Sequence, residues 1–250
     1  MGRKRRLLLY RNGPTAPQVV ADVGDYFEWF TRVIGDRAEV IAHWAQSEPR
    51  PPLQSSGFDG VVLTGSPLSL VEPAPWMDEA SEFTRQTAAA GIPVLGVCFG
   101  HQLLGYAWGG RVRVNPRGWE AGTHEVELTP AGRTDPLFQG IPDRLQVNQS
   151  HRDEVSDLGP ETIRLAGSEH SENQAIGIGE HVRGVQFHPE MNGTVIRRVI
   201  SHRHSILTED AHKTGRSRTH HADVLLDRSK DTPEAELVVL NFLRGFVERA

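Results

Sequence analysis

Apolar residues in the first hundred positions fall into short continuous runs separated by stretches of helical period. Four runs predict buried strands, from Leu7 to Tyr10, Ala38 to Ala42, Phe58 to Thr64 and Pro93 to Val97. Large apolar residues recur at helical spacing from about Asp25 to Ile34, which predicts a helix between the first two strands. This alternation is typical of a parallel sheet covered by helices.

After residue 100 the apolar runs are shorter, which predicts the strands of a meander and of hairpins. These predicted strands are Arg111 to Val114, Thr123 to Leu128, Arg144 to Asn148, Thr162 to Ala166, Asn173 to Ile178 and Val182 to Phe187. Helices are expected from Trp76 to Ala90 and after the N-cap Thr232, and Glu48 to Pro52 is expected to be a surface connection. We therefore expect one α/β domain over residues 1–250, with a doubly wound, mostly parallel sheet and a small antiparallel extension.

Length and composition fit such a domain and narrow its function. At 250 residues with 38% hydrophobic content, the chain can bury a full α/β core. A formal charge of −5 gives no reason to expect a nucleic-acid partner. One cysteine suits a reducing compartment, and no apolar run approaches the roughly 18 residues of a membrane span. We expect a soluble, cytoplasmic protein without a signal peptide or a membrane partner.

Cys98 ends the fourth predicted strand and precedes a predicted helix. A nucleophile at a sharp strand-to-helix turn is lifted out of the sheet, and Gly96 and Gly100 leave room for the turn and for a substrate. The N-terminus of the following helix favours a thiolate over a thiol. A lone cysteine in an apolar run is often an inert core residue, so Cys98 alone leaves both interpretations open.

A second stretch favours the catalytic interpretation. Gly184 to Phe187 is another apolar run, and it leads into His188, Pro189 and Glu190. In an extended chain His188 and Glu190 point to the same side. Glu190 can then orient the imidazole toward the thiol, as in a nucleophile, base and acid triad.

At this point the sequence resembles the class I glutamine amidotransferases, especially small proteins similar to the glutaminase domain of GMP synthase and to γ-glutamyl peptidases. Gly-Val-Cys-Phe-Gly-His-Gln at 96 to 102 is similar to the nucleophile motif, and Phe-His-Pro-Glu at 187 to 190 to the His/Glu motif. Thr-Gly-Ser-Pro-Leu-Ser at 64 to 69 stands in place of the Gly-Gly-Pro oxyanion loop. Asn-Gln-Ser-His-Arg-Asp at 148 to 153 resembles the segment that contacts the substrate's amino-acid end. Because four motifs occur in the family's order, the probability of a chance match is very small.

The resemblance implies a flavodoxin-like sheet, a Cys-His-Glu amidohydrolase and no cofactor. Cys98 is the implied nucleophile, His188 the general acid and base, and Glu190 its orienting acid. The implied oxyanion hole is formed by the amide of Phe99 and the loop of Gly65 and Ser66, where Ser66 replaces a family glycine. The implied substrate contacts are Gln102, Gln149, Ser150 and His151.

The sequence does not show what happens to the released nitrogen, and two enzymatic interpretations stay open. One is a glutaminase that passes ammonia from glutamine to a separate synthetase; the other is a self-sufficient γ-glutamyl peptidase that needs no partner. No nucleotide-binding phosphate loop is recognisable on this chain. A third interpretation, a binding module without turnover, is disfavoured because Cys98, His188 and Glu190 are all present.

Two further features are assigned no function. Five histidines between His202 and His221 invite a metal hypothesis, but they lack a His-Glu-x-x-His frame. We therefore expect a solvated, partly mobile segment and no metal. Trp119 and Glu120 are expected to be a packed aromatic and a solvated acid.

Overall fold

The structure, a computed structural model, describes residues 3–51, 53 and 57–249. Within these residues, nine strands form one mixed sheet in the order β2-β1-β3-β4-β11-β10-β9-β6-β7, and β5 pairs with β8 in a second, antiparallel sheet. The strands are β1 (Arg5–Arg11), β2 (Ala38–Trp44), β3 (Gly60–Leu63), β4 (Val94–Val97), β5 (Arg111–Val114), β6 (Glu120–Leu128), β7 (Arg144–His151), β8 (Asp153–Asp157), β9 (Thr162–Gly167), β10 (Ala175–Ile178) and β11 (Val182–Val185). Strands β2, β1, β3, β4 and β11 run parallel, and β10, β9, β6 and β7 continue the sheet in antiparallel pairs. The predicted fold class is confirmed.

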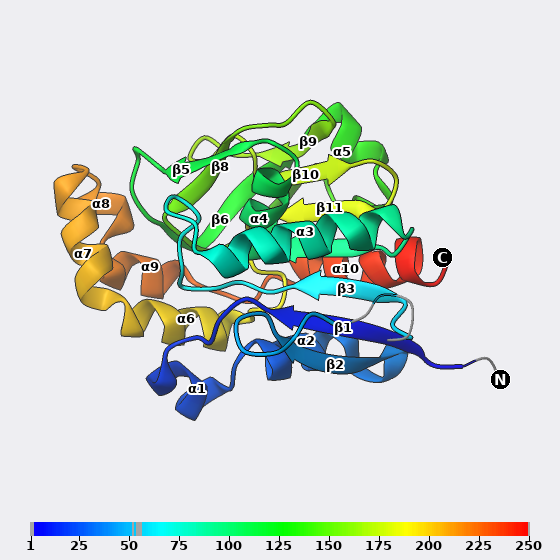
Figure 1. Cartoon of the computed structure of the whole chain (residues 1–250). Helices are drawn as coiled ribbons and strands as arrows, with labels where there is room; N and C mark the ends of the chain where they lie inside the picture. The colour runs from blue at the N-terminus through cyan, green and yellow to red at the C-terminus, as the bar shows by residue number, and fades with distance from the viewer. Residues whose placement is uncertain (1–2, 52, 54–56, 250) are drawn as a thin grey trace.

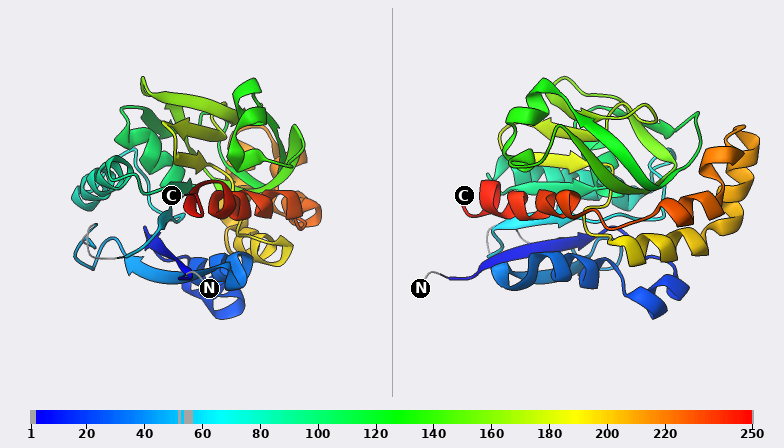
Figure 2. Two further views of the ribbon diagram at one scale, coloured as in Figure 1. Left: turned by 90° about the vertical axis from the view of Figure 1, so that its right-hand side faces the viewer. Right: turned by 180° about the vertical axis from the view of Figure 1, so that it is seen from behind.

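Helices cover both faces of the sheet (Figures 1 and 2). They are α1 (Pro17–Val23), α2 (Tyr26–Ile34), α3 (Pro75–Ala89), α4 (Phe99–Ala107), α5 (Pro130–Thr134), α6 (Gly193–His202), α7 (His204–Lys213), α8 (Ser217–His220), α9 (Ala222–Arg228) and α10 (Pro233–Phe242), with short 3-10 turns at Gly35–Arg37 and Pro136–Phe138 and a π-helical turn at Leu243–Val247. Helices α3 and α4 pack on one face, and α2, α6 and α10 pack on the other.

Strand β1 shows why the sheet has two covered faces. Leu7 and Leu9 belong to the core beneath α2 and α10, whereas Leu8 and Tyr10 belong to the core beneath α3. Successive side chains of a strand point to opposite faces, so an unbroken apolar run needs cover on both. The central strands β3, β4 and β11 are buried along their whole length for the same reason.

The predicted helices over Asp25–Ile34 and Trp76–Ala90 are found at Tyr26–Ile34 and Pro75–Ala89. Asp25 is the N-cap of α2 and accepts a hydrogen bond from Phe27 N at 2.9 Å. Thr232 is the N-cap residue of α10, but its side chain makes no capping bond, because its hydroxyl instead accepts from Asn148 at 3.4 Å. Pro52, at the end of the predicted surface connection, lies outside the described residues.

The histidine-rich segment, expected to be solvated, is helical, and most of its residues are exposed or half-buried. Residues 202–221 lie largely in α6, α7 and α8, and Leu207 and Ala211 of α7 are buried, because they form an apolar face at helical spacing. In Figure 1 helices α6 to α9 lie at the end of the molecule toward which strands β1 and β3 point. Across the part of the chain that is described, no group of three or more His, Cys, Asp or Glu side chains is arranged to hold a metal ion. None of the described helices combines the length and apolar character that crossing a bilayer requires.

Candidate active site

A crevice of about 250 Å³ lies at the carboxyl ends of the central strands. Loops after β3 and β4 contribute to it, and β11, the parallel neighbour of β4, leads to His188. Open α/β sheets bind ligands at this edge, because loops of neighbouring parallel strands meet there. Its lining includes Ser66, Pro67, Leu68, Ser69, Cys98, Gln102, Val114, Trp119, Ser150, His151, Arg152, Asp153 and Arg203.

Cys98 occupies the sharp turn between β4 and α4. Its φ of 53° and ψ of −103° are strained for a residue with a side chain, and among the described non-glycine residues no other φ is positive. The turn is possible because strand and helix touch: a Cβ at Gly96 would lie 2.5 Å from the carbonyl oxygen of Gly100. Because the first amides of a helix lack intrahelical acceptors, the amide of Phe99 can serve a ligand beside the thiol.

His188 and Glu190 form a buried pair after β11. The Nδ1 atom of His188 lies 2.8 Å from Glu190 Oε1, and both side chains are almost fully buried. Burial alone would lower the pKa of His188, but the charge of Glu190 and the neighbouring Cys98 more than offset it and raise the pKa to about 10. The imidazole is therefore held in a fixed orientation next to the cysteine.

The loop of Gly65 and Ser66 closes against this pair. A Cβ at Gly65 would lie 3.0 Å from both His188 Cε1 and the hydroxyl of Tyr26, so only glycine fits without displacing them. Ser66 does not have a positive φ, so its backbone does not require the glycine that the family carries. Its hydroxyl accepts a hydrogen bond from Leu68 N at 3.2 Å, which is typical of a serine-stabilised turn.

The four residues implied as substrate contacts are placed differently from one another. Gln102 and Ser150 line the crevice, and Gln102 Nε2 donates to Asp153 O at 2.9 Å. His151 also lines it, although its ring is held by Glu120 at 2.9 Å and by the Asp153 carbonyl at 3.0 Å. The side chain of Gln149 is fully buried and donates to Gln174 Oε1 at 2.8 Å, and Gln149 is not among the lining residues.

Glu120 corrects a second expectation. It is 1% exposed rather than solvated, because His151 and Gln174 both bond to its carboxylate, the latter at 2.7 Å. Burial acts to raise its pKa, but the hydrogen bond and the charge of His151 dominate and lower it to about 2. Glu120 therefore fixes the ring of His151, which lines the crevice. Trp119, also expected only to pack, is partly buried and lines the crevice.

Two further polar side chains at the site also lie outside the four motifs. Tyr26, the first residue of α2, is close to Cys98, Glu190 and Arg203, and burial raises the pKa of its hydroxyl above the ordinary value. Arg203 follows α6 and lines the crevice. No local pattern around either residue signals this role, because the fold brings them to the site from distant parts of the chain.

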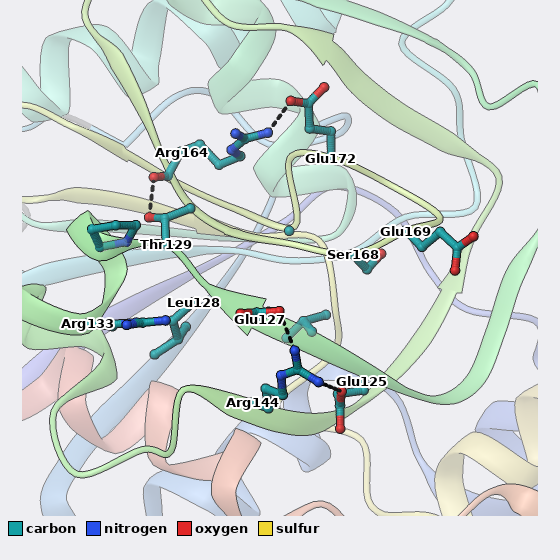
Figure 3. Close-up of a pocket in the computed structure, with 13 residues that line it drawn as sticks. Glu125, Glu127, Leu128, Thr129, Arg133, Arg144, Arg164, Ser168, Glu169 and Glu172 are labelled. Atoms are coloured by element: carbon teal, nitrogen blue, oxygen red, sulfur yellow. Dashed lines mark hydrogen bonds and ion pairs between the residues drawn. The ribbon is translucent and has the colours of Figure 1, made fainter.

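A larger cleft of about 640 Å³ runs along β6 and β9 (Figure 3). Charged side chains line it and pair with one another: Arg144 lies 3.1 Å from Glu127 and 3.6 Å from Glu125, and Arg164 pairs with Glu172. Its described lining includes neither cysteine nor histidine. Size alone therefore does not identify the functional site, and the smaller crevice is the one that Cys98 lines.

The chain is similar to two kinds of known protein. A glutamine-hydrolyzing GMP synthase subunit from Methanoculleus marisnigri is 33% identical over 73% of this chain and 92% of that protein. Gamma-glutamyl peptidase 3 of Arabidopsis thaliana is 26% identical over 79% of this chain and 82% of that protein. The match to the GMP synthase of Nitratiruptor covers only 34% of that longer protein.

The solved structures show the same fold. A glutamine amidotransferase of Thermotoga maritima superposes with a TM-score of 0.74 at 24% identity, over 99% of this chain and 100% of that one. Residues 19–206, which include all four motifs, match the family Glutamine amidotransferase class-I. The chain belongs to the class I glutamine amidotransferase family.

Proposed function

We propose that this protein hydrolyses the γ-carboxamide of glutamine or of a γ-glutamyl compound through a thioester on Cys98. The thiolate attacks the amide carbon, and the protonated His188 gives its proton to the leaving nitrogen as the C–N bond breaks. His188 then takes a proton from water, which attacks the thioester and releases glutamate from the sulfur. Glu190 orients the imidazole throughout.

One observation carries this proposal. His188 is fixed by Glu190 at 2.8 Å, contacts the Gly65 loop, and interacts with Cys98 at its strained turn. The proposed base and orienting acid are buried beside the proposed nucleophile, Cys98, which lines the crevice. The amide of Phe99, at the N-terminus of α4, and the amide of Ser66 are the groups that would receive the oxyanion. Gln102 and Ser150 are the proposed polar contacts of the substrate.

Two reactions fit this chemistry, and each has a relative that supports it. Similarity to a GMP synthase subunit favours a glutaminase that supplies ammonia to a separate synthetase. Similarity to a gamma-glutamyl peptidase over most of both chains favours a self-sufficient hydrolase. We place the glutaminase first, because the identity to the GMP synthase subunit is higher. The lone cysteine is the feature that favours a reducing, cytoplasmic compartment for either reaction.

A hydrolysis assay of the purified protein separates the two reactions. Glutamine and a series of γ-glutamyl dipeptides are offered in parallel, and released glutamate is measured. Rapid hydrolysis of dipeptides without a partner supports the peptidase, whereas weak glutaminase activity that a synthetase stimulates supports the glutaminase. No release from any of these substrates, with and without a synthetase, would refute both. Cys98→Ser is the control for contaminating activity.

A further inference from the structure

A guanidinium faces the crevice without a carboxylate partner. Arg203 lies directly after α6, is partly buried, and lines the same crevice as Cys98. The titratable groups that interact with it are Tyr26 and Cys98, and neither is a carboxylate. Among the described residues, no Asp or Glu side chain forms an ion pair with it. A cation held partly out of water without a counter-ion is costly, so its position favours an anionic ligand.

Two contacts fix this guanidinium in place. Its Nη1 atom donates to the carbonyl oxygen of Ser150 at 3.3 Å and also bonds to the Ser150 hydroxyl. Its central carbon lies 5.0 Å from the centre of the Trp119 ring, which is a cation–π contact. These contacts leave the planar fork preorganised, with donors that they do not use. Such a fork matches the two oxygens of a carboxylate.

We propose that Arg203 binds the α-carboxylate of the γ-glutamyl group, an inference that rests on the proposed function. Glutamine and every γ-glutamyl compound with a free α-carboxylate present this anion a few bonds from the carbon that Cys98 attacks. Ser150, which holds Arg203, belongs to the segment proposed to face the amino-acid end of the substrate. Arg203 thereby selects γ-linked over other amides and sets the distance between the carbonyl and the thiol.

Another role for Arg203, electrostatic support of the Cys98 thiolate, predicts different behaviour. A residue that acts on the thiol alters its reaction with every electrophile. A residue that binds the α-carboxylate alters only reagents that carry this group. Covalent labelling of Cys98 distinguishes the two roles and needs neither turnover nor a partner protein.

The experiment compares three reagents by intact mass. The first is a glutamine analogue with a chloroketone at the γ-position, the second is the same compound with its α-carboxylate converted to a carboxamide, and the third is a simple chloroketone. They are applied to wild type, Arg203→Met, Arg203→Lys and Arg198→Met. Arg198 is the matched control: it lies on α6, carries the same charge, and pairs with Asp22 outside the crevice.

In wild type we expect the α-carboxylate reagent to label about 10- to 100-fold faster than its amide, as for a hydrogen-bonded ion pair. Arg203→Met should abolish this preference and leave the rate of the simple chloroketone unchanged. Arg203→Lys should keep part of the preference, and Arg198→Met all of it. If Arg203→Met does not fold, judged by its thermal midpoint, the wild type and Arg203→Lys still give the comparison.

Three results would overturn the proposal. They are equal labelling by acid and amide in wild type, a preference that survives in Arg203→Met and Arg203→Lys, and an equal slowing of all three reagents in either Arg203 variant. Failure of the proposed function has a different pattern. Neither glutamine-like reagent would label wild-type Cys98 faster than the simple chloroketone, and free glutamine would not slow the labelling.

Discussion

Two buried Glu–His pairs lie near the crevice, and they are nearly equal in length. His188 and Glu190 are 2.8 Å apart after β11, and His151 and Glu120 are 2.9 Å apart where β7 faces β6. The partners of the second ring nitrogen differ. In His151 it contacts the carbonyl oxygen of Asp153, whereas the ring of His188 interacts with Cys98.

We expect this difference to separate a proton-transfer pair from a supporting pair. A ring with both nitrogens committed to fixed acceptors has no site through which to exchange a proton with a substrate. A ring with one nitrogen beside a nucleophile does. A buried Glu–His hydrogen bond is therefore weak evidence of catalysis by itself, and the group next to the second nitrogen decides its function.

Replacement of Cys98, the group next to the His188 ring, should have the largest effect on activity. We expect Cys98→Ser to reduce hydrolysis by about 10⁴-fold or more, because serine is close in size but a poor nucleophile with this base. Steady-state release of glutamate measures the loss, and an unchanged thermal midpoint shows that the fold is intact. Wild-type turnover in the variant would remove Cys98 from the proposed site.

Within the first pair the histidine should matter more than its acid. His188→Ala should reduce kcat by about 10⁴-fold, and Glu190→Gln by roughly 10- to 100-fold less, because the imidazole moves protons in both half-reactions whereas the carboxylate orients it. Initial rates at saturating substrate give both values. A larger loss in Glu190→Gln than in His188→Ala would contradict these assigned roles.

Replacement of Glu120 in the second pair should change the free energy of unfolding. Glu120→Ala leaves the polar groups around it buried without an acceptor and should lower the free energy of unfolding by about 3 kcal/mol. Urea denaturation measures the free energy of unfolding. Glu127→Ala, at an exposed position on the same strand, is the control and should change this free energy by less than about 1 kcal/mol. If Glu120→Ala abolished turnover without changing the free energy of unfolding, the second pair would be catalytic after all.

The smallest effect separates the pairs by pH. The pKa of Glu120 is lowered from 4.5 to about 2, so its contribution to stability is complete above pH 4.5 and is lost as the pH falls toward 2. The pKa of His188 is raised from 6.5 to about 10, so its contribution is complete below pH 6.5 and is lost as the pH rises toward 10.

Unfolding free energies across pH should show both transitions. Glu120→Gln should flatten the acid side and Glu190→Gln the alkaline side. An exchange of these two effects between the variants would show that the assignment of the titrating groups is wrong.

The sequence predicted which groups lie near one another at the centre of the candidate site, because these groups follow strand ends. Cys98 and the Gly65 loop come after neighbouring parallel strands, and His188 comes soon after a third, so finding the strands also predicts their meeting. The strand predicted from Val182 to Phe187 ends at Val185 in the structure. The chain leaves β11 there, and His188 N donates to Asn148 O at 2.8 Å. The catalytic roles themselves stay predictions.

Tyr26, Glu120 and Arg203 could not be placed in the same way. Each is a polar residue at the start, end or flank of an element, and its burial depends on packing between segments far apart in sequence. Helix α6, which leads to Arg203, did carry local signals: the N-cap Asn192 and an apolar face that includes Val195, Ile196 and Val199. The side chain of Arg203 itself follows no period.

The pairing of β4 has a consequence for how the protein is made. Strand β4, which leads to Cys98, pairs with β3 on one side and with β11 on the other, and Val94 of β4 pairs with Val182 of β11, far along the chain. During synthesis β4 is therefore translated before β11 and keeps an open edge until β11 emerges. Cys98 and His188 cannot meet before then, so the proposed site cannot form until β11 and the residues that follow it have been synthesised.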